Sequence, residues 1–238
     1  DTAFAIDLDL DGQDDTVLIE SINFSEYDIN YRVNITLAAD PDNTFSDTAE
    51  YCYDGYAVVV DCDESDSRRE LLLCVWQDSE DGSTKSFRLN DEGAEFVTDT
   101  AGYFFCDSEE ALFFNGALRL YERRDVLGTH DIYSGFTVTN EGFKLTETEY
   151  YYSDDAAGIP VIAEVPVSVT DDESGESYGI KLAPGSFITP ISTDLATYAC
   201  VRLSGGELAF IYFDDFDYGI PYINGKQQEE YFRVMYSD

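Results

Sequence analysis

A segment near the start of the chain carries an acidic side chain at almost every second position. Between the apolar stretches 3–6 and 16–22 the sequence reads Asp7-Leu8-Asp9-Leu10-Asp11-Gly12-Gln13-Asp14-Asp15. Gly12 permits a sharp reversal of the chain, and the last carboxylate comes eight residues after the first. A hard cation such as Ca²⁺ takes about six to eight oxygen ligands, and this spacing supplies most of them from one short loop. The segment therefore predicts two antiparallel strands joined by a calcium loop.

Four aspartates are the predicted side-chain ligands: Asp7, Asp9, Asp11 and Asp15. Four carboxylates in one short loop repel one another strongly unless a cation lies between them. Asp and Gly are also ordinary turn formers, so the alternative is a plain turn that tolerates charge. In the calcium interpretation the ion is structural, because it ties the two flanking strands together.

The same order of elements, an apolar strand, an acidic loop and a second apolar strand, returns at residues 56–76. An acidic residue, Glu70, again precedes the outgoing strand. This loop lacks the glycine, and Arg68 and Arg69 stand where a metal would need oxygens. We expect the loop to hydrogen-bond its own turn as a relic of the first one, with metal binding at 61–63 as the alternative.

A more degenerate third copy occupies residues 103–114, which gives a period of roughly 50 residues. In an all-β chain such repeats are typical of four-stranded propeller blades. Elsewhere, alternating apolar stretches are separated by turns such as Asp-Gly and Asn-Gly, and no long segment has helical periodicity. Residues 38–50, rich in Asp, Thr and Pro, are expected to form a loop. The chain is predicted to be all-β.

The composition changes at residues 153–158, where small and polar residues precede two prolines. We predict a domain boundary here. Residues 1–157 are then a degenerate or incomplete propeller-like repeat region with the calcium loop, and residues 158–238 are a small β-barrel. About five or six short strands in the second part favour a closed barrel, because closure removes the exposed edges of a short sheet.

The net charge excludes several classes of partner. The chain has 50 acidic residues against 13 basic ones, a formal net charge of −37. A field of this sign argues against nucleic acid and anionic membranes, and it favours divalent cations, cationic partners or simply a solvated coat. No apolar run approaches the ~20 residues of a membrane span. The acidity, the calcium loop and the start at Asp1, which suggests a removed leader, predict an extracellular or cell-surface protein.

The loop at 7–15 resembles the calcium loops of FG-GAP and VCBS-type β-propeller repeats, in which an Asp-x-Asp-x-Asp-Gly-x-x-Asp segment links two strands of a blade. The resemblance implies a structural Ca²⁺ held by the four aspartates and also by the backbone carbonyl of Gln13. Three units are recognisable, fewer than the roughly four or more blades of a closed propeller. The region is therefore an incomplete propeller or a sandwich built from the same hairpins.

Segments 58–75, 125–129 and 222–232 are similar to a group of uncharacterised exported proteins of Gram-positive bacteria. Those proteins join degenerate propeller-like repeats to a C-terminal barrel of the bacterial Src-homology-3 type, here called SH3-like. The resemblance implies this fold for the two parts of the chain. It implies no activity.

Candidate catalytic and reactive residues are few. His130 is the single histidine, no Gly-x-Ser-x-Gly elbow is present, and among 50 acidic residues a pair of carboxylates carries little specificity. The five cysteines show no Cys-x-x-Cys spacing, so we expect free thiols rather than zinc, with one disulfide as the alternative. We predict a non-enzymatic exported or cell-surface protein that binds a cell-wall component, a glycan or a protein partner. The alternative is an extracellular hydrolase acting on polysaccharide or peptidoglycan.

Aromatic rings and carboxylates alternate at residues 212–222, which are expected to form a loop of the barrel. Such a surface can stack on a sugar or hold a cationic peptide. The predicted ligand-binding residues are Tyr212, Phe216, Tyr218 and Tyr222. The alternative is that these rings pack against the barrel itself.

Overall fold

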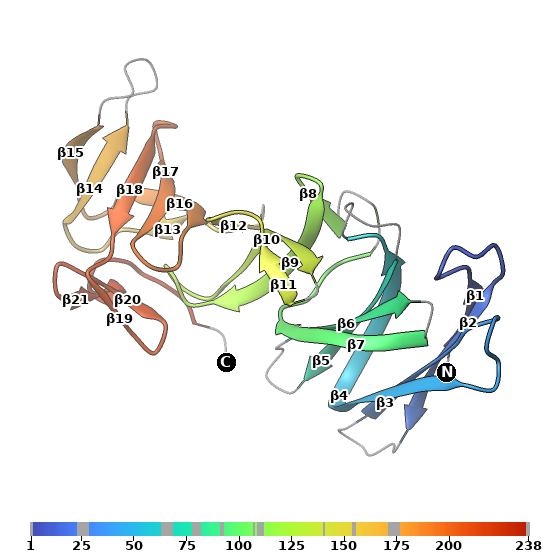
Figure 1. Ribbon diagram of the computed structural model, residues 1–238. Helices are drawn as coiled ribbons and strands as arrows, with labels where there is room; N and C mark the ends of the chain where they lie inside the picture. The colour runs from blue at the N-terminus through green and yellow to red at the C-terminus, as the bar shows by residue number, and fades with distance from the viewer. Residues whose placement is uncertain are drawn as a thin grey trace. The chain divides into compact units, whose positions relative to one another are not determined.

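The computed structural model describes residues 2–22, 29–62, 69–77, 82–90, 93–106, 108, 112–139, 141–153, 156–170 and 177–236 (Figure 1). Strands dominate this part of the chain and form several antiparallel sheets, which confirms the all-β prediction. Two compact units can be distinguished. Unit 1 comprises Asp1–Glu122 and Gly135–Thr146, and unit 2 comprises Arg123–Ser134 and Glu147–Asp238. The predicted boundary between 157 and 158 falls inside unit 2.

Unit 1 is built on a seven-stranded sheet in which every strand pairs with its neighbour in the chain. Antiparallel neighbours joined by short loops need no crossover, so the sheet order follows the sequence. The strands are β1 (Thr2–Ile6), β2 (Asp15–Ile22), β3 (Ile29–Thr36), β4 (Thr44–Val60), β5 (Glu70–Gln77), β6 (Gly82–Asn90) and β7 (Gly93–Ala101).

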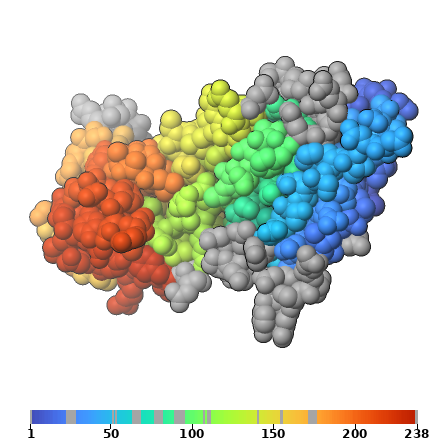
Figure 2. All heavy atoms as spheres, turned by 60° about the horizontal axis from the view of Figure 1, so that its bottom comes forward, coloured from blue at the N-terminus to red at the C-terminus, as the bar shows by residue number. Residues whose placement is uncertain are grey.

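The long strand β4 serves two halves of this sheet. Its first part, up to Cys52, pairs with β3, and its second part, from Cys52 to Val60, pairs with β5. The register shifts between Cys52 and Asp54, as expected where a strand bends. As a result β7 lies beside β4 and β3, and Figure 2 shows β7 in green next to β4 in light blue. The prediction of a loop at 38–50 is therefore wrong from Thr44 onward, where β4 begins. The polar residues of this segment form a strand because they pair with β3, and the sequence of the segment alone does not reveal that partner.

The core of unit 1 lies between the two halves of the sheet. In β3, alternate residues Val33 and Ile35 point into this core, as the period of a half-buried strand requires. In β5, residues 71–75 are all buried, which is typical of a strand covered on both faces. Unit 1 also contains the pairing of β8 (Phe113–Phe114) with the first residues of β9 (Ala117–Arg124) and the pairing of the last residues of β10 (His130–Thr139) with β11 (Gly142–Leu145). The remaining residues of β9 and β10 belong to unit 2.

Unit 2 contains a second antiparallel sheet and a small hairpin sheet. Five of its strands pair in the order β15-β14-β18-β17-β16, and β12 and β13 both pair with β16. The bounds are β12 (Tyr150–Tyr152), β13 (Ile159–Pro160), β14 (Val165–Thr170), β15 (Ser177–Leu182), β16 (Phe187–Thr193), β17 (Tyr198–Leu203) and β18 (Leu208–Tyr212). The hairpin sheet follows as β19 (Asp215–Asp217), β20 (Ile220–Ile223) and β21 (Lys226–Gln227), and a 3-10 turn spans Gln228–Glu230.

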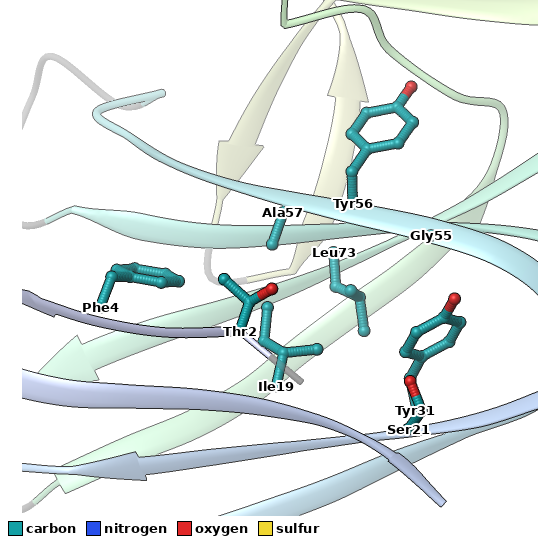
Figure 3. Close-up of a pocket in the computed structure, with 9 residues that line it drawn as sticks. All are labelled: Thr2, Phe4, Ile19, Ser21, Tyr31, Gly55, Tyr56, Ala57 and Leu73. Carbon is teal, nitrogen blue, oxygen red and sulfur yellow. The ribbon is translucent and has the colours of Figure 1, made fainter.

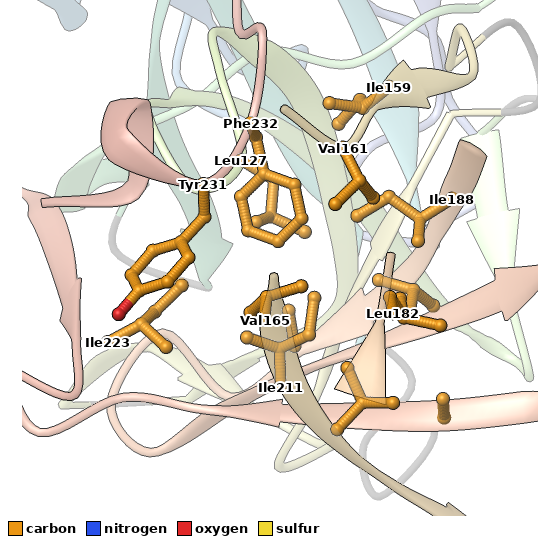
Figure 4. Close-up of a cluster of buried hydrophobic side chains, with 14 of the residues drawn as sticks. Leu127, Ile159, Val161, Val165, Leu182, Ile188, Ile211, Ile223, Tyr231 and Phe232 are labelled. Carbon is orange, nitrogen blue, oxygen red and sulfur yellow. The ribbon is translucent and has the colours of Figure 1, made fainter. Parts of the chain in front are cut away.

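The core of unit 2 gathers aliphatic side chains from most of these strands around Phe232 (Figure 4). In β14 the valines at 165, 167 and 169 are buried and alternate with more exposed residues. Gln228 is fully buried, and its side chain satisfies backbone groups of the 125–127 segment: it accepts the N–H of Leu127 and donates to the carbonyl of Asp125. The C-terminal segment is thereby hydrogen-bonded to residues 125–127.

No sheet formed by the described residues closes on itself. The all-β prediction is thus confirmed, while the propeller-like region and the SH3-like barrel stay predictions.

Candidate metal centre

The acidic loop lies between β1 and β2, and its own side chains shape it. Leu10 and Gly12 both take the left-handed conformation, with φ of 61° and 90°. The Oδ2 atom of Asp7 accepts the N–H of Gly12 at 3.0 Å, and Oδ1 of Asp9 accepts the N–H of Asp11 at 3.1 Å. These bonds turn the first two carboxylates inward, across the loop.

Asp15 anchors the loop to the core of unit 1. It is the first residue of β2 and only 1% exposed. Its Oδ2 atom accepts the N–H of Leu8 at 2.9 Å, and its Oδ1 atom accepts the N–H of Ala38 at 2.8 Å. The side chain of Leu8 is fully buried in the same core. Each carboxylate oxygen retains a lone pair after one hydrogen bond, so Asp15 can still coordinate a cation.

Three of the predicted ligands converge. Carboxylate oxygens of Asp7, Asp9 and Asp15 lie within 4.8 Å of one another. The Oδ1 atom of Asp7 is buried and accepts no hydrogen bond within the described part of the chain. A buried carboxylate oxygen without a donor is costly, and a cation is the partner that removes this cost. The donor set, all oxygen and all anionic, fits Ca²⁺.

The electrostatics of the loop follow from this crowding. Burial raises the pKa of Asp9, and the charges of Asp15, Asp11 and Asp7 raise it further, whereas the hydrogen bond from the Asp11 N–H opposes them. Arg69 approaches the loop: its Nη1 donates to the backbone carbonyl of Asp7 at 3.3 Å. This contact reaches the main chain of Asp7 and leaves its Oδ1 atom without a hydrogen-bond donor.

The other two predicted ligands bond to each other. Oδ1 of Asp11 accepts the N–H of Gln13 at 2.7 Å, and Oδ2 accepts the Gln13 side-chain amide at 2.9 Å. Both residues are exposed at the tip of the loop. Asp11 is not among the converging carboxylates, and a role for it as a ligand requires its carboxylate to move toward them.

The second acidic loop uses the same contact with a different outcome. Oε2 of Glu70, the first residue of β5, accepts the N–H of Cys62 at 3.0 Å. Oε1 of Glu70 receives Nη2 and Nε of Arg88 at 3.1 and 3.2 Å, and both side chains are buried. Residues 63–68, on which the question of metal binding depends, lie outside the described residues.

The aromatic segment of unit 2 does not place its four rings alike. Phe216 packs against the hydrophobic core and meets Phe213 edge to face at 5.4 Å. Tyr218 is 98% exposed at the turn between β19 and β20, and Tyr212 is exposed on β18. Tyr222 is half-buried opposite Asp215. A role of these residues in ligand binding stays a prediction.

The histidine is partly buried, and most of the thiols are buried. His130 lies edge to face with Tyr152 at 5.3 Å, and its Nε2 is 3.2 Å from the carbonyl of Leu127. All five cysteines are free, as expected, and four are buried. Burial raises the pKa values of Cys52, Cys74 and Cys200 to about 11, so these thiols stay protonated at neutral pH.

One feature of unit 1 was missed by the sequence patterns. A cleft with a volume of about 440 Å³, here called the β1–β5 cleft, opens between the two halves of the sheet (Figure 3). Its walls are Thr2, Phe4, Ile19, Ser21, Tyr31, Gly55, Tyr56, Ala57 and Leu73. The alternation of β1, β2 and β3 marks these residues as facing inward, but it does not show that the two halves of the sheet leave a space between them.

No family model matches the sequence, and neither the curated proteins nor the solved structures contain a match to it. Among the residues that the structure describes, no helix has both the length and the apolar character required to cross a membrane.

Proposed function

We propose that the chain is a calcium-stabilised all-β module of an exported or cell-surface protein, and that it binds a ligand or partner rather than catalysing a reaction. The observation that carries the proposal is the convergence of Asp7, Asp9 and Asp15 around the buried, unbonded Oδ1 atom of Asp7. Extracellular modules bind Ca²⁺ with dissociation constants on the order of 10⁻⁴ to 10⁻³ M, which a site with few carboxylates can reach.

In this proposal the ion stabilises the edge of unit 1. β1 pairs with β2, and no second pairing partner is present among the described strands. A cation held by Asp7 and Asp9 from the loop and Asp15 from the start of β2 would close this hairpin at one end. The expected consequence is a more stable β1, with no effect on unit 2.

We infer further that hairpins β1–β2 and β4–β5 are degenerate copies of one propeller-type repeat. The support is the shared contact in which the first residue of the outgoing strand accepts an N–H from the second residue of the loop, Leu8 to Asp15 and Cys62 to Glu70. For unit 2, the run of five short antiparallel strands around one core supports an SH3-like barrel.

The melting temperature in 10 mM Ca²⁺ and in chelator tests the calcium site. At about 10 to 100 times the dissociation constant, Ca²⁺ adds about 1.4 to 2.7 kcal/mol to the free energy of unfolding, a rise of several degrees. Asp9→Asn should remove most of this gain. In chelator the same variant should melt slightly above the wild type, because one of the mutually repelling charges is gone. Asp14→Asn, an equal charge change at an exposed neighbour outside the converging set, should keep the full gain.

Two results would refute the calcium site. One is a melting temperature that does not respond to 10 mM Ca²⁺ in the wild type. The other is a gain of equal size in wild type and Asp9→Asn, which would assign the calcium effect to the acidic surface as a whole.

A further inference from the structure

The β1–β5 cleft has the size and lining of a ligand site. Its volume of about 440 Å³ falls within the range of about 300 to 1,000 Å³ that small-molecule sites occupy. Charged residues make up 26% of the chain, yet none of those that the structure describes lines the cleft. A ligand held there therefore meets apolar groups and uncharged polar groups.

The two ends of the cleft differ in chemistry (Figure 3). Phe4 stands at one end, and Ile19 and Leu73 continue its apolar surface across the middle. At the other end lie Ser21 and Tyr31, which are directly opposite each other in the pairing of β2 with β3. This end presents an aromatic ring and hydroxyl groups.

A glycine and a carboxylate complete the Tyr31 end. A Cβ atom at Gly55 would lie 3.3 Å from Cε2 of Tyr31 and 3.0 Å from the carbonyl of Cys74, so the absence of a side chain there lets the ring lie against β4. The preceding residue, Asp54, is exposed, and its Oδ1 atom accepts the N–H of Gly55 at 2.8 Å. This carboxylate therefore lies near the ring, because it contacts the N–H of a glycine whose backbone packs against Tyr31. Burial, and next the charge of Asp54, raise the pKa of Tyr31.

We propose that the β1–β5 cleft binds a small amphipathic amine. The apolar body of the ligand lies against Phe4, Ile19 and Leu73, and its ammonium group lies between the ring of Tyr31 and the carboxylate of Asp54. A cation gains from both an aromatic face and a carboxylate, and an anionic head group would be repelled by Asp54 and by the net charge of −37. The inference names a ligand class for the proposed binding role and rests on that role.

Three probes with one apolar chain test the proposal by isothermal titration calorimetry on the whole chain: octylamine, octanol and octanoate at neutral pH. Octylamine should bind about five- to tenfold more tightly than octanol, from a partly exposed ion pair and a cation–π contact, and octanoate should bind most weakly. Octanoate binding as tight as that of octylamine, or no binding of octylamine, would overturn the proposal.

Three variants locate the binding. Asp54→Asn, which can still accept the N–H of Gly55, should weaken octylamine binding about fivefold and leave octanol binding unchanged. Asp217→Asn, an equal charge change at an exposed position in unit 2, should change neither. Ala57→Phe should abolish binding of octylamine and octanol by filling the cleft, with the melting temperature as the check on folding.

Unchanged octylamine affinity in Asp54→Asn would overturn the assignment of the ammonium group, even if Ala57→Phe did not fold. The calcium and amine results are separable. A calcium shift without amine binding overturns this inference and leaves the calcium-stabilised module, whereas amine binding without a calcium shift overturns only the calcium site.

Discussion

The two acidic loops of unit 1 each contain a buried carboxylate, and they compensate its charge in different ways. In both, a buried carboxylate at the start of the outgoing strand accepts an N–H from the loop, at 2.9 Å for Asp15 and 3.0 Å for Glu70. Beyond this bond they diverge. The second oxygen of Glu70 receives the guanidinium of Arg88, whereas the second oxygen of Asp15 accepts the backbone N–H of Ala38.

The difference lies in where the compensating charge comes from. A buried carboxylate needs donors or a cation, and the β4–β5 loop obtains a cation from its own chain. The β1–β2 loop adds the carboxylates of Asp7 and Asp9 beside Asp15 and leaves the buried Oδ1 atom of Asp7 without a donor. Its negative charge is compensated only in part by the contact of Arg69 with the main chain. The stability of the first loop is therefore expected to depend on the cations in solution, whereas the stability of the second loop is not.

The largest expected effect comes from removing the internal cation. Arg88→Met leaves Glu70 buried without its charge partner, and breaking such a pair costs about 3 to 5 kcal/mol in the free energy of unfolding, measurable by urea denaturation. Calcium should not restore the loss.

Two further variants test this explanation. Glu70→Gln combined with Arg88→Met should recover more than half of the loss, because no charge is then buried and Gln can still accept the N–H of Cys62. Lys85, on the same strand as Arg88, forms a partly exposed pair with Asp47 of β4. Lys85→Met should cost less than about 1 kcal/mol. A cost of this small size for Arg88→Met would mean that the buried pair is not what compensates Glu70.

The next effect concerns the anchor of the first loop. Asp15→Ala leaves the buried N–H of Leu8 and the partly buried N–H of Ala38 without their acceptor, and a buried donor left without an acceptor costs about 1 to 3 kcal/mol. A total loss of about 2 to 4 kcal/mol is expected in chelator, since these bonds involve no ion, and a larger loss is expected in calcium, where a ligand of the proposed site is removed as well. The measurement is urea unfolding in both buffers.

Asp14→Ala is the matched control for Asp15→Ala, and an exposed position should change stability by less than about 0.5 kcal/mol. A loss for Asp15→Ala that appears only in calcium would show that Asp15 acts as a ligand and not as an anchor. Equal losses in the two buffers would show the reverse, and the calcium response would then depend on Asp7 and Asp9.

Local patterns were sufficient for the hairpin that carries the acidic loop. Apolar stretches at 3–6 and 16–22 predicted strands that the structure places at Thr2–Ile6 and Asp15–Ile22. The turn residues between them marked the loop, and the alternating aspartates marked its inward-facing carboxylates. Asp7 and Asp9 were therefore accessible to sequence reasoning because their partners lie within the same loop.

Contacts between distant segments could not be predicted from the sequence. The acceptor role of Asp15 toward Ala38 and the pairing of Glu70 with Arg88 span 23 and 18 residues and depend on which strands become neighbours. The strand from Thr44 was missed for the same reason, since its polar residues are stabilised by pairing with β3. The β1–β5 cleft requires the bend in β4, and the register shift at Cys52–Asp54 has no local signal.

The smallest expected effect concerns Asp194, a loop carboxylate of unit 2 whose hydrogen bonds come from its own loop. It can be compared with the carboxylates of the two acidic loops. Oδ1 of Asp194 accepts the N–H groups of Ala196, Thr197 and Tyr198 at 2.7 to 3.0 Å, and Oδ2 accepts the hydroxyl of Thr197. Burial alone would raise the pKa of Asp194, but these hydrogen bonds outweigh it and hold the pKa below its ordinary value of 3.8. Because the folded-state pKa is depressed, the stabilisation is complete above the unfolded value and is lost as the pH falls through the folded one.

Asp194→Asn should therefore cost about 0.5 to 1 kcal/mol at pH 7, and the difference from the wild type should shrink below pH 3.8 as Asp194 becomes protonated. Urea unfolding at pH 7 and pH 3, each with calcium and with chelator, provides the measurement, and Asp217→Asn is the exposed control. A difference that depends on calcium, or one that is the same at both pH values, would contradict the prediction. A difference that depends on pH alone would show that donors can replace a cation at a loop carboxylate, so that the missing donor at Asp7 is what distinguishes the first loop.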